Sequence, residues 1–536
     1  MSSKAAKREQ PKTKQRPKEL DTPSGLEASV PLSAQASIHI GASTLSILVT
    51  DVSEEGTEPL EFLEQSLPIA RDVFSNGTIK RETIERAVEI LLGYLASLQE
   101  MGMGREQITR VVVTNILAEA SNHDVVINRL AVATGLTVEI LDDGEMTRLI
   151  YQKTRRKISQ FRSLKKKTTL VIHVGPGNTR ALLFKEGRIQ DFESYRLGTH
   201  RTAEVIDDSF ATGETELRLI RDQASSPASR MKHDLAPHAS DPVEAIVFIG
   251  YEIQHVATSL IGKNQRCSLS ALKKLCTQIS ELPSDQRAGS YHLDHHAAEA
   301  LLPALQICLC IADTFKLKDF YIPDSLYERG LLYDLPFTAS LSEEFEQEVI
   351  RSAKNLAKKY ETHTRHGKTV ANLCQLLFEA TQSLHQLDKR DALFLQTAAF
   401  THECGGFISP QMHHKHSEYL ILHSEIFGLS ERERTIVALV ARYHRMSPPK
   451  LTHSLYQSLV DRDRLRVSKL AAILRVADAL DRTHTGRVKS LSTKIERDRL
   501  LITLPQLDDV SSERLALENK ANLFRDIFGL EVVLAQ

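Results

Sequence analysis

The sequence predicts a two-lobed α/β front half, an all-α region behind it, and a small α+β segment at the end. Three observations support this prediction. A short glycine-containing motif occurs twice, as IHIGAST and as IHVGPGNT, about 130 residues apart. Strand-like and helix-like stretches alternate up to about residue 340, and almost every apolar stretch from about residue 345 onward has helical spacing. The chain has 536 residues, enough for several domains.

These observations divide the chain into five segments. The segments are a basic disordered tail (1–36), a first lobe (37–168), a second lobe (169–340), an all-α domain (341–490) and an α+β cap (491–536). The tail mixes Lys, Arg, Pro, Ser and Gln with few large apolar side chains, so it cannot offset the entropy of ordering. A solubilising extension is the simpler interpretation of this tail, and contact with a polyanion is the alternative.

The first lobe begins with a hairpin pattern. SIHIGASTLSILVTDV predicts two β-strands joined by a small-residue turn, because β-branched and apolar residues flank Gly41. Residues 78–102 then show apolar side chains at helical spacing, 110–116 resemble a buried strand, and 124–135 predict an amphipathic helix that ends at Gly135. The lobe is therefore expected to alternate strands and helices.

The second lobe repeats this opening. TTLVIHVGPGNTRALLF again reads strand, tight turn, strand, and it is followed by an apolar strand at AIVFIGYEI, a long helix over 295–315 and a strand at DFYIP. Helices alone are predicted between residues 343 and 484. IERDRLLITL and FGLEVVLA return to strand-like alternation at the end of the chain.

Composition excludes several classes of protein. With 68 basic and 69 acidic residues, the chain has no overall attraction for nucleic acid, and without tryptophan it has little material for base stacking. We therefore expect no specific nucleic-acid partner. The sequence contains no run of about 18 apolar residues, no apolar signal stretch and no Cys-x-x-Cys pair. A cytoplasmic protein without a membrane partner is expected.

The duplicated turns are candidate phosphate-binding loops. A glycine-rich hairpin turn exposes successive backbone N–H groups and small hydroxyls, which suit phosphate oxygens. The candidate residues are Gly41, Ala42, Ser43 and Thr44 in the first turn, and Gly175, Gly177, Asn178 and Thr179 in the second. Two such turns facing each other would hold a chain of phosphates. The plain alternative is that both are ordinary turns.

The chain resembles the exopolyphosphatase and guanosine-pentaphosphate phosphatase (Ppx/GppA) family of the actin-like, ribonuclease H-like ATPase superfamily. The resemblance runs from Ser37 to the end. It is carried by the segments IHIGAST, FSNGTIKRETI, VTNILAEASN, TVEILDDGEMTRLIY, LVIHVGPGNT, YRLGTHRTAE and YERGLLYDL. It implies an actin-like fold, a homodimer, and hydrolysis of a terminal phosphoryl group from inorganic polyphosphate or from guanosine penta- or tetraphosphate.

This sequence departs from the family at reactive positions. The family usually has aspartate where His39 and His173 stand, arginine at Ala118 and a catalytic glutamate at Met146. Methionine cannot accept a proton from water, and alanine cannot neutralise a phosphate. Glu145, adjacent to Met146, is the candidate catalytic residue of this altered cleft. The alternative is that it belongs to a solvated acidic turn with Asp142 and Asp143.

The all-α segment holds a second candidate site. The segment resembles the histidine–aspartate (HD) metal phosphohydrolases, which implies six ligands for one or two divalent ions, Mg or Mn: His366, His402, Glu403, His413, His444 and Asp478. Imidazoles and carboxylates around such ions activate water and polarise phosphoryl oxygens. His366 shares a helical face with Val370 and Leu373, so it should point into the bundle. Alternatively, the 21 histidines cluster by chance, with His414 and His416 exposed on a capping segment.

Two functional hypotheses remain open. The first is a phosphohydrolase of this family with an altered front cleft, in which the metal site of the helical segment carries the reaction. The second is a catalytically inactive member, a pseudoenzyme, that binds a phosphorylated ligand and signals its presence to a partner. The changes at His39, Ala118, Met146 and His173 favour the second hypothesis.

Overall fold

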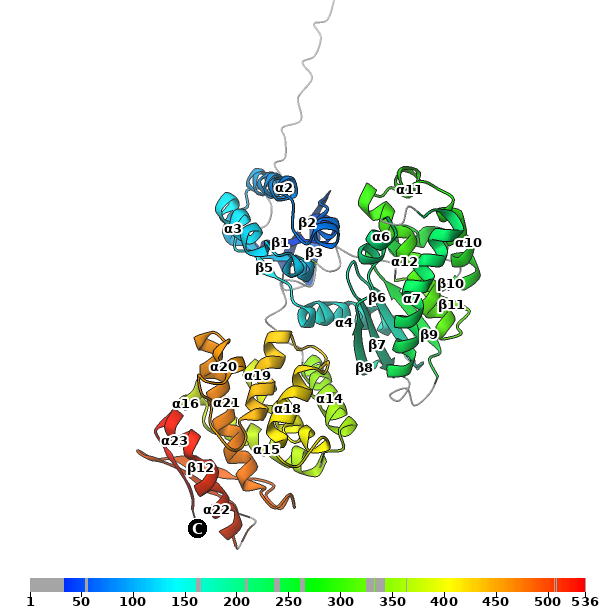
Figure 1. Cartoon of the computed structure of the whole chain (residues 1–536). Coiled ribbons are helices and arrows are strands. Elements are labelled where there is room, and N and C mark those ends of the chain that lie inside the picture. The colour runs from blue at the N-terminus through cyan, green and yellow to red at the C-terminus, as the bar shows by residue number, and fades with distance from the viewer. Residues whose placement is uncertain are drawn as a thin grey trace, which may run out of the picture.

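The computed structural model describes residues 33–53, 56–160, 164, 166–207, 211–235, 242–260, 266–323, 332, 343–362, 364–505, 507 and 509–535. Three bodies follow one another along the chain: two α/β lobes and a helical body that carries a small sheet (Figure 1). Most of the predicted tail, the motif YERGLLYDL and the expected boundary near residue 340 lie outside the described residues.

The first lobe is built on a five-stranded sheet in the order β3-β2-β1-β4-β5. Its strands are β1 (Ala34–Ile40), β2 (Thr44–Ser53), β3 (Gly56–Ser66), β4 (Ile108–Val113) and β5 (Glu139–Ile140). Its helices are α1 (Ile69–Asn76), α2 (Arg81–Glu100), η1 (Arg105–Gln107), η2 (Asn115–Glu119), α3 (His123–Thr134) and α4 (Asp143–Gln160). As predicted, α3 ends at Gly135, whose φ of 69° suits glycine. Strand β1 already begins at Ala34, so the expected tail boundary at residue 36 is wrong by a few residues.

The second lobe has a six-stranded sheet in the order β10-β11-β9-β6-β7-β8. Its strands are β6 (Thr169–Val174), β7 (Thr179–Lys185), β8 (Arg188–Tyr195), β9 (Ala245–Ile249), β10 (Arg266–Ser268) and β11 (Asp319–Tyr321). Its helices are α6 (Thr199–Asp207), α7 (Gly213–Leu235), α8 (Tyr251–His255), α9 (Ala257–Leu260), α10 (Leu269–Ser280), α11 (Ser284–Tyr291) and α12 (His295–Thr314). The predicted apolar strand AIVFIGYEI is strand only to Ile249, because a helix starts at Tyr251.

The internal duplication is confirmed by topology. Both lobes start with two hairpins and a helix, β1-β2-β3-α1 and β6-β7-β8-α6, and in both the next strand pairs parallel to the first. His39 lies opposite Ser46 across the first hairpin, and His173 lies opposite Arg180 across the second. The two motifs therefore occupy equivalent positions, at the same ends of equivalent strands.

Helix α12 explains the longest apolar stretch of the chain. Among the described residues it alone is long and apolar enough to span a membrane by length and composition, and 83% of its most apolar window is buried. It packs against α7, α6 and α10 in the core of the second lobe. Asp294 caps its start by accepting hydrogen bonds from the His296 and Ala297 N–H groups. Its hydropathy therefore fits a core helix.

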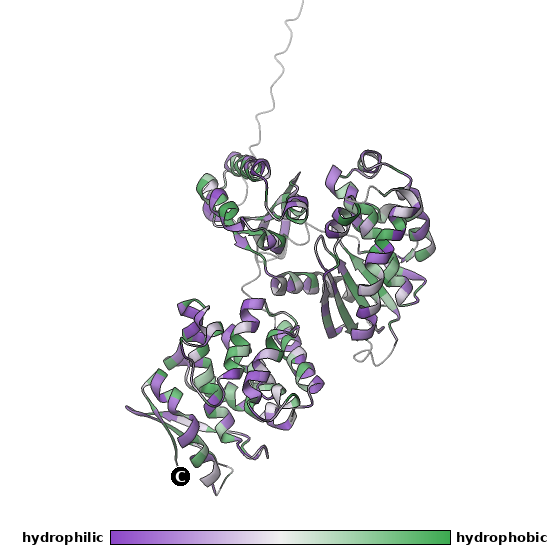
Figure 2. Ribbon diagram, in the orientation of Figure 1, coloured by the Kyte–Doolittle hydropathy of each residue, from purple (hydrophilic) through white to green (hydrophobic). Residues whose placement is uncertain are grey.

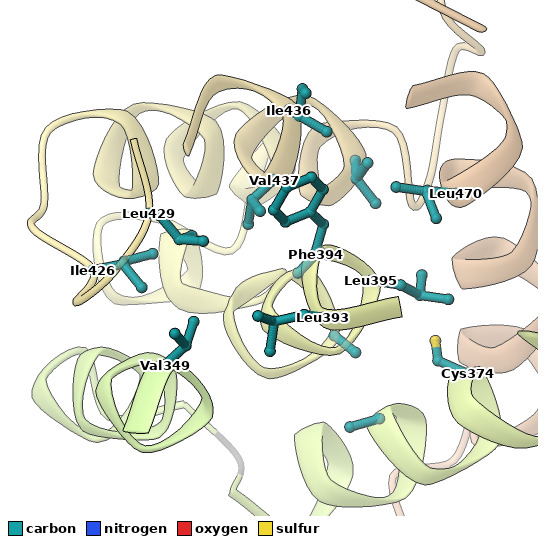
Figure 3. Close-up of a cluster of buried hydrophobic side chains, with 14 of the residues drawn as sticks. Val349, Cys374, Leu393, Phe394, Leu395, Ile426, Leu429, Ile436, Val437 and Leu470 are labelled. Carbon is teal, nitrogen blue, oxygen red and sulfur yellow. The ribbon is translucent and has the colours of Figure 1, made fainter. Parts of the chain in front are cut away.

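The third body is helical, as predicted. Its helices are α14 (Glu343–Lys359), α15 (Thr364–Ala380), α16 (Gln382–His385), α17 (Lys389–Thr401), η5 (Cys404–Phe407), α18 (His413–Leu422), α19 (Glu431–Arg442), α20 (Ser454–Gln457) and α21 (Asp461–Leu480). Figure 3 shows Leu393, Phe394 and Leu395 of α17 pointing in different directions between the neighbouring helices. Helix α17 is thus central and contacts α14, α15, α19 and α21.

The end of the chain closes this body. It consists of β12 (Ser492–Ile495), β13 (Arg499–Thr503), α22 (Ser511–Lys520), α23 (Asn522–Phe528) and β14 (Glu531–Leu534), with the strands in the order β12-β13-β14. Apolar residues of these elements, including Leu500 and Phe524, belong to the same buried cluster as α17 and α21. The predicted cap and the helical segment therefore share one core, and hydrophobic and hydrophilic residues alternate along their helices (Figure 2).

Helix α4 joins the bodies. Tyr151 stacks on Phe184 of the second sheet, with ring centroids 6.1 Å apart, and lies edge-on to Phe427 of the helical body at 5.3 Å. Helix α14 adds two backbone contacts, since Arg351 and Asn355 donate hydrogen bonds to the carbonyls of Ile189 and Gln190 in β8. An aromatic cluster thus connects the second lobe to the helical body.

All six cysteines are buried and unpaired. Four lie in the second lobe and two in the helical body, and burial raises the thiol pKa of each, to about 11 for Cys267 and about 12 for Cys404. This agrees with the absence of a disulfide framework expected from the sequence.

Candidate functional sites

The duplicated turns face a small cavity between the two lobes. Six of the eight predicted phosphate-binding residues line this cavity: Ala42, Ser43, Thr44, Gly175, Gly177 and Asn178. Gly41 and Thr179 are absent from its described lining, and the hydroxyl of Thr179 instead donates to the Leu197 carbonyl at 2.6 Å. The cavity volume is about 50 Å³, enough for a few water molecules at about 10–15 Å³ for each.

In both turns a side chain in place of the glycine would crowd a carbonyl of the turn and a buried imidazole. A Cβ on Gly41 would lie 3.3 Å from Cε1 of His39 and 2.9 Å from the Thr44 carbonyl oxygen. A Cβ on Gly175 would lie 3.0 Å from Cε1 of His173. His39 and His173 are buried and line the cavity from both sides. His39 and His173 are therefore part of the cavity wall.

The backbone of the turns is already engaged by the following helices. Ala70 at the start of α1 donates its N–H to the Ala42 carbonyl at 2.8 Å. In the second lobe, Thr199 donates to Gly175, and His200 donates to Pro176 at 3.1 Å. These bonds fix each turn against a helix N-terminus, so the turns are preorganised.

A polar network missed by sequence reasoning spans the cavity. Ser43 Oγ lies 2.7 Å from His200 Nε2, and this contact joins the two lobes. Glu252, 3% exposed, accepts a hydrogen bond from Thr199 at 2.9 Å and lies 3.5 Å from His200 Nε2. Glu252 thus places a buried carboxyl group at the cavity.

Glu145 lies outside this cavity among the described residues, whereas Met146 lines it. The Glu145 carboxylate pairs with Arg110 at 2.6 Å and lies 3.5 Å from Arg148. Asp142 accepts a hydrogen bond from the Glu145 N–H at 2.9 Å, which caps helix α4. The acidic turn is thus a helix start tied to an arginine, and this geometry does not support a base at Glu145.

The six predicted metal ligands, by contrast, meet in one cluster of the helical body. His366 Nε2 lies 3.3 Å and His402 Nε2 lies 3.9 Å from the same oxygen, Oδ1 of Asp478. The His402 and His444 rings are 4.8 Å apart between centroids, and His413 Nε2 lies 3.2 Å from His444 Nε2. His366, His402 and Asp478 are at most 3% exposed. Their ligand atoms lie within 4.8 Å of one another, close enough for one ion.

The outer nitrogens of the three buried histidines are all engaged. His402 Nδ1 lies 2.8 Å from the Ala399 carbonyl, and His444 Nδ1 lies 2.6 Å from the Ala441 carbonyl. His366 Nδ1 lies 2.8 Å from the carboxylate of Asp481. A carbonyl at Nδ1 can only accept, so it keeps the proton on Nδ1 of His402 and His444 and leaves Nε2 of both as the inward lone pair. Metal-binding histidines are held in this way.

The electrostatics of the cluster suit a cation. Burial opposes ionisation of Asp478, but Lys520 and His366 outweigh it and hold the Asp478 pKa well below its usual range. Burial lowers the pKa of His402, and it holds that of His444 well below its usual range. For His366, burial is outweighed by Asp478 and Asp481, which raise its pKa to about 9. The cluster therefore combines an ionised carboxylate with neutral imidazoles at His402 and His444, and a bound metal would have to displace the proton that Asp478 and Asp481 favour on His366.

Glu403 lies at the outer edge of the cluster. It forms a second possible ligand group with His366 and His484, and His484 Nε2 lies 3.7 Å from its Oε1. The His484 ring stacks on His366 with centroids 3.7 Å apart. Sequence reasoning missed both His484 and Asp481, although both follow Asp478 within six residues. The alternative that His414 is exposed is wrong, since His414 is 8% exposed.

A larger pocket opens beside this cluster. Its volume is about 430 Å³, and its lining includes Glu403, His413, His444 and Asp478 together with four basic residues, Arg445, Arg475, Arg482 and Lys520. A phosphorylated molecule placed there would contact positive side chains and the inward-facing ligand atoms at once. One part of the pocket lining thus holds imidazole and carboxylate groups, and another part is basic.

Known proteins match nearly the whole chain. The model of the Ppx/GppA phosphatase family matches residues 48–337, and that of Ppx/GppA phosphatase domain III matches residues 350–520. The guanosine-5'-triphosphate,3'-diphosphate pyrophosphatase of Photobacterium profundum is 20% identical over 483 residues, covering 88% of this chain and 91% of that protein. Its counterpart in Pseudoalteromonas atlantica is 21% identical over 467 residues, covering 85% and 89%.

Solved structures also match. An exopolyphosphatase from Cytophaga hutchinsonii aligns with a TM-score of 0.48 at 15% identity, covering 57% of this chain and 98% of that one. A Ppx/GppA family member from Aquifex aeolicus aligns with a TM-score of 0.44 at 17% identity, covering 58% of this chain and 100% of that one.

Proposed function

Because this chain belongs to the Ppx/GppA phosphatase family and has its actin-like fold, we propose that it is a metal-dependent phosphohydrolase whose reaction takes place at the histidine cluster of the helical body. The observation that carries this proposal is the orientation of three buried histidines. Each engages a carbonyl or carboxylate through Nδ1, and His366 and His402 direct Nε2 toward Asp478. Burial removes water from these nitrogens and from the Asp478 carboxylate, which costs free energy. Bonds from these atoms to a bound cation would offset that cost.

Of the two ions expected, Mg and Mn, the residues fit Mn²⁺ better, because Mg²⁺ prefers oxygen ligands and this donor set is rich in imidazole. Asp478 is the carboxylate ligand, His366, His402 and His444 are the nitrogen ligands, and Glu403 and His413 lie toward the pocket. When bound, the metal supplies an activated water and charge neutralisation for a phosphoryl group. The chain's own part is to orient the ligands through the carbonyls of Ala399 and Ala441 and the carboxylate of Asp481.

The substrate proposed for this reaction is inorganic polyphosphate or guanosine penta- or tetraphosphate, with loss of a terminal phosphoryl group to water. The curated relatives are named as guanosine-5'-triphosphate,3'-diphosphate pyrophosphatases, which supports the second substrate class. We also propose that the protein is a cytoplasmic homodimer, which light scattering would detect as twice the mass of one chain.

A first experiment compares phosphate release from long-chain polyphosphate and guanosine pentaphosphate, with Mg or Mn, by wild type, His402→Ala and Glu145→Gln. His402→Ala is expected to lose at least 100-fold in kcat/KM, because it removes an inward-facing ligand. Glu145→Gln is expected to stay within about threefold of wild type, because that side chain pairs with Arg110 outside the cavity. Loss only in Glu145→Gln would return the reaction to the front cavity.

One observation favours a second candidate, a phosphate sensor without turnover. The front cavity retains both turns, while Met146 lines it and the neighbouring acid is tied to Arg110. If no variant releases phosphate and orthophosphate still raises the melting temperature, the sensor is supported. Arg180 lines the front cavity. If Arg180→Met abolishes the shift in melting temperature and His402→Ala does not, the phosphate binds in the front cavity.

A further inference from the structure

The C-terminal segment places a lysine at the histidine cluster. Lys520 is the last residue of α22, and its ammonium group donates a hydrogen bond to Oδ2 of Asp478. The opposite oxygen, Oδ1, is the one that faces His366 and His402. One oxygen of the Asp478 carboxylate thus bonds to Lys520 and the other faces the histidines. Lys520 therefore does not occupy the oxygen that faces the histidines.

A buried arginine fixes Lys520 in place. Arg475, 2% exposed, donates from Nε to the Lys520 carbonyl at 2.8 Å and from a terminal nitrogen to the side-chain oxygen of Asn522 at 3.1 Å. Its other terminal nitrogen lies 3.2 Å from the carbonyls of Tyr443 and Met446, which flank His444. Arg475 therefore ties the end of α22 to the turn that carries His444.

The pocket beside the cluster concentrates positive charge on this side. Arg445 and Arg482 line it together with Lys520, and the acidic groups in its described lining are Glu403 and Asp478. Glu403 faces His484 and Asp478 faces Lys520. The remaining basic side chains are thus positioned for an anion that enters from the pocket.

We propose that Lys520, with Arg445 and Arg482, binds the terminal phosphoryl group of the substrate against the histidine cluster. This inference rests on the proposed function and adds a residue from the C-terminal segment to its site. The ligand class is a compact phosphoryl group at the end of a phosphate ester or anhydride. The hydrogen bond from Lys520 to Asp478 need not break when the phosphoryl group binds. An ammonium group has three N–H donors, so it can donate to the Asp478 carboxylate and to a phosphoryl oxygen at the same time.

The test uses the full chain, Mn²⁺ and inorganic phosphate. Electron paramagnetic resonance measures Mn²⁺ affinity, and ³¹P relaxation measures only the phosphate held close to bound Mn²⁺, so phosphate at the front cavity does not interfere. Lys520→Met is expected to weaken this phosphate binding at least tenfold while Mn²⁺ affinity stays within threefold of wild type. Lys520→Arg should retain phosphate binding within threefold.

Two further variants control for folding and for general charge. Lys469 is also a half-buried lysine of the helical body and donates to the His385 carbonyl, so Lys469→Met removes a comparable charge away from the pocket and should change nothing. Arg445→Met should weaken phosphate binding about fivefold, because it removes the positive guanidinium group of a second side chain in the pocket. It supplies the test if Lys520→Met fails to fold.

Three results would overturn the inference. Unchanged phosphate relaxation in Lys520→Met, with Mn²⁺ bound, would remove Lys520 from the substrate site and leave the proposed metal site standing. Equal losses of Mn²⁺ and phosphate affinity would make Lys520 a positioning residue for Asp478. Failure of wild type to bind Mn²⁺ would overturn both the proposed function and this inference.

Discussion

His402 and His444 are placed by the same local device. Each follows the end of a helix, α17 or α19, and each binds through Nδ1 the carbonyl three residues earlier, at Ala399 or Ala441. The last carbonyls of a helix have no hydrogen-bond partner within the helix. An imidazole that donates to one of them therefore gives that carbonyl a partner, and the same bond fixes the orientation of the ring. Two helix ends thus supply two of the inward-facing nitrogens.

Asp481 offers a test of ligand orientation without removal of a ligand. Asp481→Asn is expected to weaken Mn²⁺ binding about 10- to 100-fold, because the amide no longer favours the required His366 tautomer. Titration calorimetry on the full chain measures this change. Asp498→Asn, an exposed acid in the C-terminal segment, is the matched control and should bind Mn²⁺ like wild type. Equal affinities in both variants would contradict the role of Asp481.

Gly198 marks the closest backbone approach at the front cavity. A Cβ there would lie 2.2 Å from the Pro176 carbonyl oxygen, so the second turn or helix α6 would have to move. Gly198→Ala is expected to destabilise the protein by about 3 kcal/mol, measured as a drop in urea midpoint. Gly289→Ala, at an exposed helical glycine with nothing within 4 Å, should instead stabilise by about 0.5–1 kcal/mol. Similar shifts in both variants would contradict the steric argument.

At the scale of elements, strand β8 carries a pH-sensitive group where it meets helix α14. Burial, followed by the charges of Asp191, Asp234 and Glu425, raises the pKa of Glu193 to about 7, and Lys359 opposes this only in part. A carboxyl group whose pKa is raised on folding stabilises the fold below its unfolded value near 4.5. That contribution is lost as pH rises through about 7.

Glu193→Gln removes this titration. Its stability relative to wild type should rise by about 2 kcal/mol between pH 4.5 and pH 8, because wild type must ionise a half-buried carboxyl group and the variant need not. Urea unfolding at both pH values measures the difference. Glu58→Gln, on exposed strand β3, should show no such change between the two pH values. A constant difference for Glu193→Gln would contradict the raised pKa.

Sequence patterns predicted the helices and strands well, but they did not predict most of the contacts between these elements. The alternation in 37–135 and the helical spacing in 343–484 are local signals, and the structure has helices and strands there. The duplicated turns could be predicted because the motif repeats in the sequence, and the six predicted metal ligands follow from the order of residues in the family that the segment resembles. Lys520 and Glu252 had no local signal, because each gains its role by contact with a residue at least 42 positions away. Only packing reveals such residues.

At the scale of the whole molecule, the helical body depends on the end of the chain. Leu500, Ile502 and Phe524 are buried in the same cluster as helix α21. Deletion of residues 491–536 is therefore expected to abolish cooperative unfolding of the helical body, since each exposed large side chain costs about 1.5–3 kcal/mol. Scanning calorimetry measures this, and deletion of residues 1–32 is the control. An unchanged transition after the C-terminal deletion would contradict a shared core.

The distribution of cysteines makes local unfolding of the protein measurable through its own thiols. Every thiol is buried, four in the second lobe and two in the helical body, whereas the first lobe has none. A thiol-reactive dye is therefore excluded from the native state and reacts only with the parts that unfold. Peptide mapping of the labelled sites would then show whether the second lobe or the helical body opens first under stress, without any engineered probe.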